Sequence, residues 1–60
     1  MHAMEQCYAD LLYQQYKAHI HGRDLPLEDT EKIAELEKAL GDEGLKRGSE
    51  EAMRRIKKGN

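Results

Sequence analysis

The side chains that could do chemistry lie together in the first third of the chain. Cys7, His19 and His21 are the residue types that bind metal ions, and a thiol beside an imidazole can also act as a nucleophile. On a helix, however, His19 and His21 would point about 160° apart, and Cys7 would lie about three turns from His19. We therefore expect no metal site and no cofactor.

Cys7 is better interpreted as a packing residue. On a helix it lies beside Met4 and Leu11, and no basic residue shares that side to activate the thiol. A catalytic site also needs several groups converging in a pocket, which a helical chain of 60 residues rarely encloses. We expect that the protein is not an enzyme.

Two segments have a clear helical pattern. The first runs from about residue 2 to 21 without Gly or Pro, and Gly22 follows where a left-handed cap would end it. The second covers about residues 27–40, with apolar residues at helical spacing, namely Ile33, Leu36 and Leu40. Between them, Pro26 disfavours a helical backbone at the preceding residue. The candidates for the N-cap of the second helix are Asp24, Asp29 and Thr30.

The last segment allows two interpretations. In the one we favour, a turn at 41–49 leads to a short helix over 49–58, capped by Ser49. In the other, one helix starts near residue 42 and tolerates Gly44 and Gly48 at about 1 kcal/mol each. The second is supported by acid–base pairs four residues apart, which are Asp42–Lys46, Glu43–Arg47, Glu50–Arg54 and Glu51–Arg55. Either way, we predict one all-α domain over residues 1–60, a small helical hairpin or a three-helix bundle with a long N-terminal helix.

The predicted helices differ in how much of their surface is apolar. Apolar side chains cover about three-quarters of the circumference of the first helix, but only about a third of the second. Part of this wide arc either fills the centre of a bundle or meets another chain. Tyr, Met and Leu are typical of interface cores, so we predict a partner-binding face made of Tyr8, Leu12, Tyr13, Tyr16, His19 and Ile20.

Chain length points the same way. A chain of 60 residues hides only about 60% of the surface that its unfolded form exposes, so it often needs a disulfide, a metal or a partner. We therefore expect an interaction module that binds a partner protein or a second copy of itself.

Residues 27–58 use mostly Glu, Lys, Arg, Ala and Leu, which is typical of thermophilic and of designed scaffolds. Both a natural and an engineered origin fit.

The alternative is a nucleic-acid-binding protein. Residues 44–60 carry six bases against Glu50 and Glu51, and a helix-turn-helix could place bases against phosphates, namely Arg54, Arg55, Lys57 and Lys58. The net charge of −2 and the two acids one turn before the arginines count against it.

The location of the protein is also predicted from the sequence. No apolar run approaches the roughly 18 residues that span a bilayer, so we expect no membrane partner. The N-terminus lacks the basic and apolar regions of a signal peptide, and a single cysteine suits a reducing compartment. We predict a cytoplasmic protein.

Overall fold

A computed structural model of the protein describes residues 3–59, and this part of the chain contains two helices and no strand. Helix α1 spans Ala3–Ile20 and α2 spans Leu27–Lys58. The all-α prediction is confirmed, whereas a three-helix bundle is wrong. The predicted helix start at residue 2 lies outside the described residues.

The end of α1 confirms the prediction at Gly22. This glycine has a φ of 69°, a left-handed conformation that glycine adopts without steric cost. Its amide donates to the carbonyl of His19 at 3.1 Å, and the amide of Arg23 donates to the carbonyl of Ala18 at 2.7 Å. These two hydrogen bonds form a Schellman motif, which satisfies carbonyls at the end of the helix.

The start of α2 differs from the prediction. Pro26 is its N-cap, with φ −55° and ψ 148°, and no side chain caps the helix. The Pro26 carbonyl instead accepts the amides of Asp29 and Thr30, at 3.0 and 3.1 Å. The expectation of a side-chain cap from Asp24, Asp29 or Thr30 is therefore wrong, because the fixed φ of Pro26 makes the change from extended to helical backbone.

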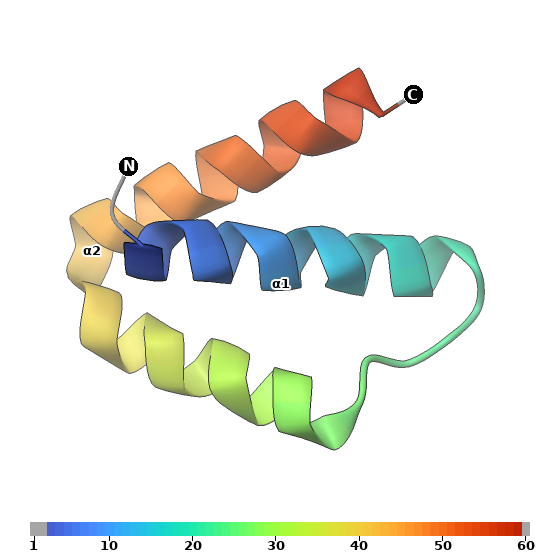
Figure 1. Ribbon diagram of the computed structural model, residues 1–60, viewed down its shortest axis with the longest axis horizontal. Helices are drawn as coiled ribbons and strands as arrows, with labels where there is room; N and C mark the ends of the chain where they lie inside the picture. The colour runs from blue at the N-terminus through green and yellow to red at the C-terminus, as the bar shows by residue number, and fades with distance from the viewer. Residues whose placement is uncertain (1–2, 60) are drawn as a thin grey trace.

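Helix α2 is sharply bent at Gly41, where φ is 72° and ψ is 175°. The bend divides it into a first arm, residues 27–40, and a second arm, residues 42–58 (Figure 1). The favoured turn at 41–49 and short helix 49–58 are wrong, and the alternative of a helix that starts near residue 42 is confirmed, because the helix resumes directly after Gly41. Gly44 and Gly48 lie inside the second arm and are buried.

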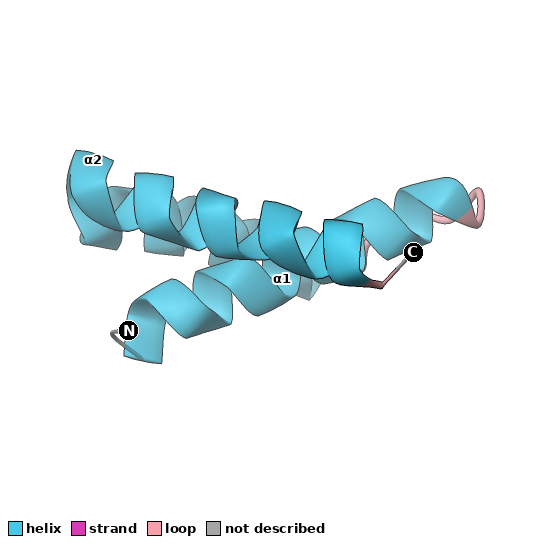
Figure 2. Ribbon diagram, turned by 90° about the horizontal axis from the view of Figure 1, so that it is seen from above, coloured by secondary structure: helices cyan, strands magenta, loops and turns pink. Residues whose placement is uncertain are grey.

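The bend places α1 between the two arms. Figure 1 shows the arms close together near the N-terminal end of α1 and diverging towards its C-terminal end. Seen from above, α1 crosses the second arm at an angle (Figure 2). The molecule is flat, with extents of 30 × 27 × 15 Å. The arms therefore enclose one end of α1 and leave the other end open.

The core fills the closed end. Its central cluster joins Tyr8 and Leu11 of α1 to Ile33 and Leu36 of the first arm. On the other side of α1, the second arm presents small buried residues four positions apart, namely Gly44, Gly48 and Ala52. Gly48 lies against Tyr8 of α1, whereas Gly44 lies against Leu40 of the first arm, and Ala9 of α1 has no exposed surface.

Candidate protein-binding face

Tyr8 lies in the core and not on the surface. It is 5% exposed, and its hydroxyl donates to Oε2 of Glu37 in the first arm at 3.2 Å. Burial raises the pKa of Tyr8 above its ordinary value of 10.0, and the charge and hydrogen bond of Glu37 raise it further, partly opposed by Ser49. We therefore leave Tyr8 out of the candidate face and regard it as the residue that joins α1 to both arms.

The other five predicted residues remain at or near the surface. Leu12, Tyr13 and Tyr16 are half-buried, and Leu12 packs against the core cluster, whereas His19 and Ile20 are exposed. At 100° per residue, all five fall within a sector of about 120° on α1. We call this set, Leu12, Tyr13, Tyr16, His19 and Ile20, the distal face.

The buried positions of α1 end at Leu11, and beyond it Leu12, Tyr13, Tyr16 and Ala18 are half-buried. Its buried residues are Glu5, Tyr8, Ala9 and Leu11, and none of the residues that follow in α1 is buried. Ile20 is 56% exposed. The two arms diverge towards this end of α1 (Figure 1), although the end of the second arm still reaches Tyr13 at Gly59.

Two contacts define the edge of the distal face. The ammonium group of Lys17 lies 5.4 Å from the centre of the Tyr13 ring, within the range of a cation–π interaction. A Cβ atom on Gly59 would lie 3.1 Å from the Tyr13 hydroxyl, so this ring is held close to the end of the second arm. Tyr13 therefore lies at the rim, and His19 and Ile20 are the exposed members of the face.

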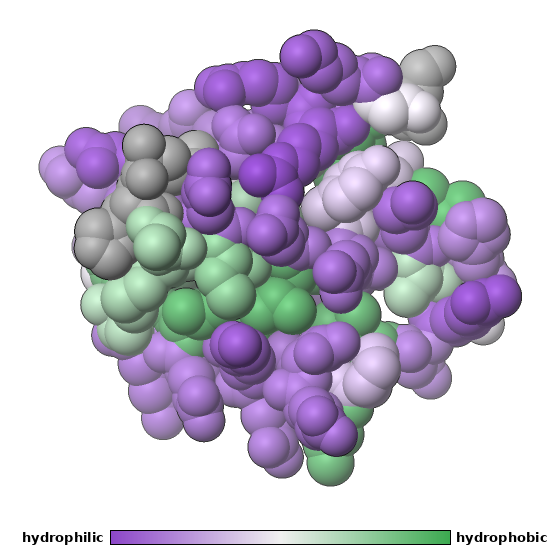
Figure 3. All heavy atoms as spheres, in the orientation of Figure 1, coloured by the Kyte–Doolittle hydropathy of each residue, from purple (hydrophilic) through white to green (hydrophobic). Residues whose placement is uncertain are grey.

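A second apolar surface lies over α1. Figure 3 shows a green strip along α1 between the two polar arms. Met4 and Cys7 are half-buried and pack against the core cluster, as predicted for Cys7. Within residues 3–59, no group of three or more His, Cys, Asp or Glu side chains could hold a metal ion.

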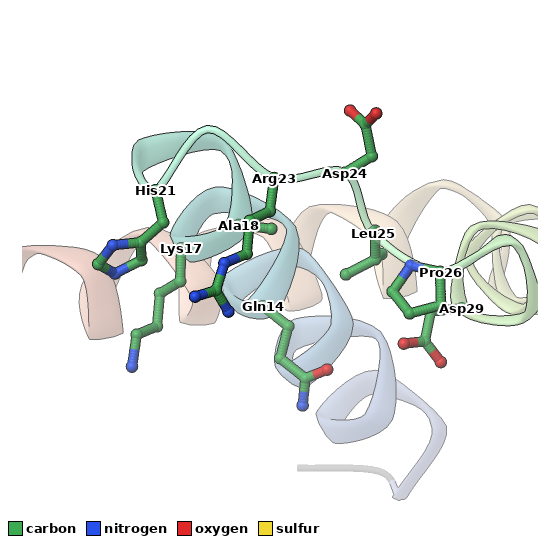
Figure 4. Close-up of a pocket in the computed structure, with 9 residues that line it drawn as sticks. All are labelled: Gln14, Lys17, Ala18, His21, Arg23, Asp24, Leu25, Pro26 and Asp29. Atoms are coloured by element: carbon green, nitrogen blue, oxygen red, sulfur yellow. The ribbon is translucent and has the colours of Figure 1, made fainter.

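A groove of about 580 Å³ separates the end of α1 from the start of α2. The side chains of Lys17 and Arg23 point to the same side of the groove, while the carboxylate of Asp24 points away (Figure 4). The floor includes Ala18 and Leu25. Bases and acids both line this open groove.

The basic residues of the alternative prediction are partly neutralised. Arg54 pairs with Glu51 at 2.9 Å, and Arg55 pairs with Glu51 at 3.2 Å and with Asp10 of α1. The hydrogen bond with Asp10 is the main reason that the pKa of Arg55 lies above its ordinary value. Lys57 and Lys58 are exposed and make no ion pair with the described residues. Of these four bases, Lys57 and Lys58 are thus the two without an ion pair to residues 3–59.

The sequence analysis missed the role of Glu37. This residue follows Ile33 by four positions, so the two lie on the same side of the first arm, and that spacing was the signal for a polar contact beside the core. It also missed the pair of Glu5 and Arg47, which are 3.6 Å apart across α1 and the second arm. No local pattern indicates that pair.

No helix among residues 3–59 is long and apolar enough to cross a membrane. Comparisons of the chain with protein-family models, with curated proteins and with solved structures find no match.

Proposed function

We propose that the protein is a non-enzymatic interaction module that binds another protein chain through the distal face. The observation that carries this proposal is the burial pattern of α1, in which no residue after Leu11 is buried although Leu12, Tyr16 and Ile20 follow. Single exposed apolar residues are normal on a protein surface. Here the exposed Ile20 lies beside the half-buried Tyr13 and Tyr16 on one side of one helix, and this grouping favours a binding surface.

The chemistry of the distal face suits this role. Tyrosine provides a large contact area with few rotatable bonds, and its hydroxyl can find a partner at the rim. Fully burying an exposed aliphatic side chain such as Ile20 contributes about 1.5–3 kcal/mol. The arms are anchored to α1 at its closed end through Tyr8, so the face is presented on a fixed element.

The nucleic-acid alternative has less support. Acidic side chains already pair with Arg54 and Arg55, and binding to phosphates would have to displace these partners.

We also propose a cytoplasmic protein, because the free thiol of Cys7 is best preserved in a reducing compartment.

Photo-crosslinking in cells that express the chain tests the proposal. A benzophenone amino acid replaces Ile20 in one variant and Leu27 in the matched control. Leu27 is also a large exposed aliphatic residue, at 72% exposure, but it lies outside the distal face. We expect a discrete protein adduct from position 20 and none from position 27. No adduct from position 20, or the same adducts from both positions, would contradict the proposal.

A further inference from the structure

We propose that the distal face binds an acidic segment of a partner protein, whose apolar side chains cover Tyr16 and Ile20 and whose carboxylates pair with Lys17 and Lys58. This inference rests on the proposed function and adds the chemistry of the partner. It is supported by the distribution of charge along the chain, by the bases that border the distal face and by the positions of the neighbouring acids.

The charges of the chain are unevenly distributed. Residues 27–51 contain nine acids against four bases. Residues 11–23 contain Lys17 and Arg23 and no acid, and residues 52–59 contain four bases and no acid. Both basic stretches lie towards the open end of the molecule, at the ends of α1 and of the second arm (Figure 1). The net charge of −2 therefore hides a basic region beside the distal face.

Two lysines from different helices border the distal face. On α1, Lys17 is exposed and its ammonium group lies 5.4 Å from the centre of the Tyr13 ring. On the second arm, the exposed Lys58 directly precedes Gly59, at which a Cβ atom would lie 3.1 Å from the Tyr13 hydroxyl. Neither lysine forms an ion pair with residues 3–59. Both are therefore available to the carboxylates of a partner.

The acids next to these basic stretches are engaged elsewhere. Asp10 and Glu51 pair with arginines of the second arm. The carboxylate of Asp24 points away from the groove (Figure 4). Asp29 lines that groove together with Ala18, which on a helix points about 160° away from the centre of the distal face. An acidic partner would therefore meet lysines at the border of the distal face.

The apolar part of the distal face favours a protein segment over a nucleic acid. Ile20 is 56% exposed, and an apolar side chain of a partner would remove it from water. Phosphates would gain from the lysines alone, and the net charge of −2 opposes binding of a polyanion. A segment with both apolar and acidic residues matches the usual pattern of an apolar interface centre with a charged rim.

Mass spectrometry of the position-20 adduct is the first test. The benzophenone at position 20 links to the segment that lies against the distal face, and sequencing the cross-linked peptide identifies this segment. We expect Asp and Glu to outnumber Lys and Arg within about ten residues of the link, which is about three helical turns. A neutral or basic segment, an adduct that nuclease removes, a lipid adduct or an adduct to a second copy would overturn the inference.

The captured segment, made as a labelled synthetic peptide, is the probe for the two lysines. Lys17→Glu/Lys58→Glu should raise its dissociation constant at least about threefold, because each attraction becomes a repulsion. Lys32→Glu/Lys38→Glu is the matched control. It changes the net charge equally at exposed positions of the first arm and should change the dissociation constant less than about twofold. Equal effects of the two double variants would overturn the inference.

Two further measurements separate charge from folding, because Lys17→Glu also removes the contact with the Tyr13 ring. Circular dichroism shows whether each variant remains helical, and Lys58→Glu alone should weaken binding in the same direction. Raising the salt concentration from about 0.05 M to about 0.5 M should weaken binding of the peptide to the wild type, since salt screens exposed charges. Binding that does not respond to salt would overturn the inference without any variant.

The two proposals fail separately. A position-20 adduct to a protein segment that is not acidic overturns this inference and supports the interaction module. The absence of any adduct from position 20 contradicts the module itself.

Discussion

The ring of Tyr8 fills the space that a side chain on Gly48 would need. A Cβ atom at position 48 would lie 2.5 Å from Cδ2 of Tyr8 and 3.4 Å from the carbonyl oxygen of Glu5. Non-bonded carbon atoms do not approach so closely, since their optimal separation is about 3.5–4.0 Å. Glycine at this position therefore sets the distance between α1 and the second arm.

We expect Gly48→Ala to destabilise the protein, although alanine is the better helix former. The clash with Tyr8 should cost about 1–3 kcal/mol, which outweighs the gain of up to about 1 kcal/mol in helix propensity. Urea unfolding followed by circular dichroism measures the difference. Lys46→Ala, at an exposed position two residues earlier, is the control and should change stability by less than about 0.5 kcal/mol. A more stable Gly48→Ala variant would show that the helices do not meet at Tyr8.

The hydroxyl of Tyr8 predicts how stability depends on pH. Because its pKa in the folded protein is raised above 10.0, the folded state favours the neutral phenol. The contribution of Tyr8 to the free energy of unfolding is fully present below pH 10 and is lost as the pH rises through the raised pKa. Tyr8→Phe should cost about 0.5–1.5 kcal/mol at pH 8 by removing the hydrogen bond to Glu37, and this difference should shrink above pH 10.

The comparison of wild type with Tyr8→Phe isolates this residue from the lysines, which titrate in the same range. Unfolding free energies at pH 8, 10 and 11 provide the test, together with tyrosinate absorbance near 295 nm. A difference between the two proteins that stays constant from pH 8 to 11 would show that Tyr8 ionises equally easily in the folded and the unfolded state.

Much of the fold could be predicted because the signals for it are local. Gly22 ends α1 through hydrogen bonds within six residues, and Ile33 and Leu36 repeat at the helical period and are buried. The connection at 23–26 follows from proline chemistry. Each of these depends on neighbours in the sequence, so no knowledge of the tertiary structure was needed.

The bend in α2 could not be predicted in the same way. Glycine can end a helix or allow two helices to approach closely, and residues 41, 44 and 48 are all glycine. Only Gly41 takes a positive φ, whereas Gly48 is required by a ring 40 positions earlier in the chain. The direction of the bend also decides which tyrosine is covered. Tyr8 faces the closed end of the arms and Tyr16 the open end. The apolar pattern of α1 in the sequence does not distinguish these two positions.

The buried carboxylate of Glu5 makes Arg47 more important than other surface arginines. The Glu5 side chain is 9% exposed and lies 3.6 Å from Arg47. Removing the arginine leaves a poorly hydrated charge without its partner, so we expect Arg47→Ala to cost about 1–2 kcal/mol. Arg54→Ala is the matched control. It breaks only a pair within the second arm and should cost less than about 0.5 kcal/mol. Equal costs in urea unfolding would contradict a special role for the pair of Glu5 and Arg47.

The backbone of Gly41 predicts the consequence of straightening α2. A Cβ atom at this position would meet nothing within 4 Å, so the cost of Gly41→Ala arises from the backbone alone. The conformation at φ 72° and ψ 175° is essentially restricted to glycine, and we expect a loss of about 1–3 kcal/mol. Alanine also favours a continuous helix through position 41. A straight α2 of 32 residues would be about 48 Å long, well beyond the present longest extent of 30 Å.

Small-angle X-ray scattering distinguishes the bent from the straight form. We expect Gly41→Ala to increase the maximum dimension at concentrations where the wild type keeps its compact profile. A synthetic chain with D-alanine at position 41 is the control, because a D-residue adopts positive φ without strain. It should retain the wild-type profile and equal or exceed wild-type stability. If L-alanine and D-alanine at position 41 gave the same scattering profile and stability, the left-handed geometry of Gly41 would not be what holds the arms around α1. The open end that leaves Tyr16 and Ile20 accessible would then need another cause.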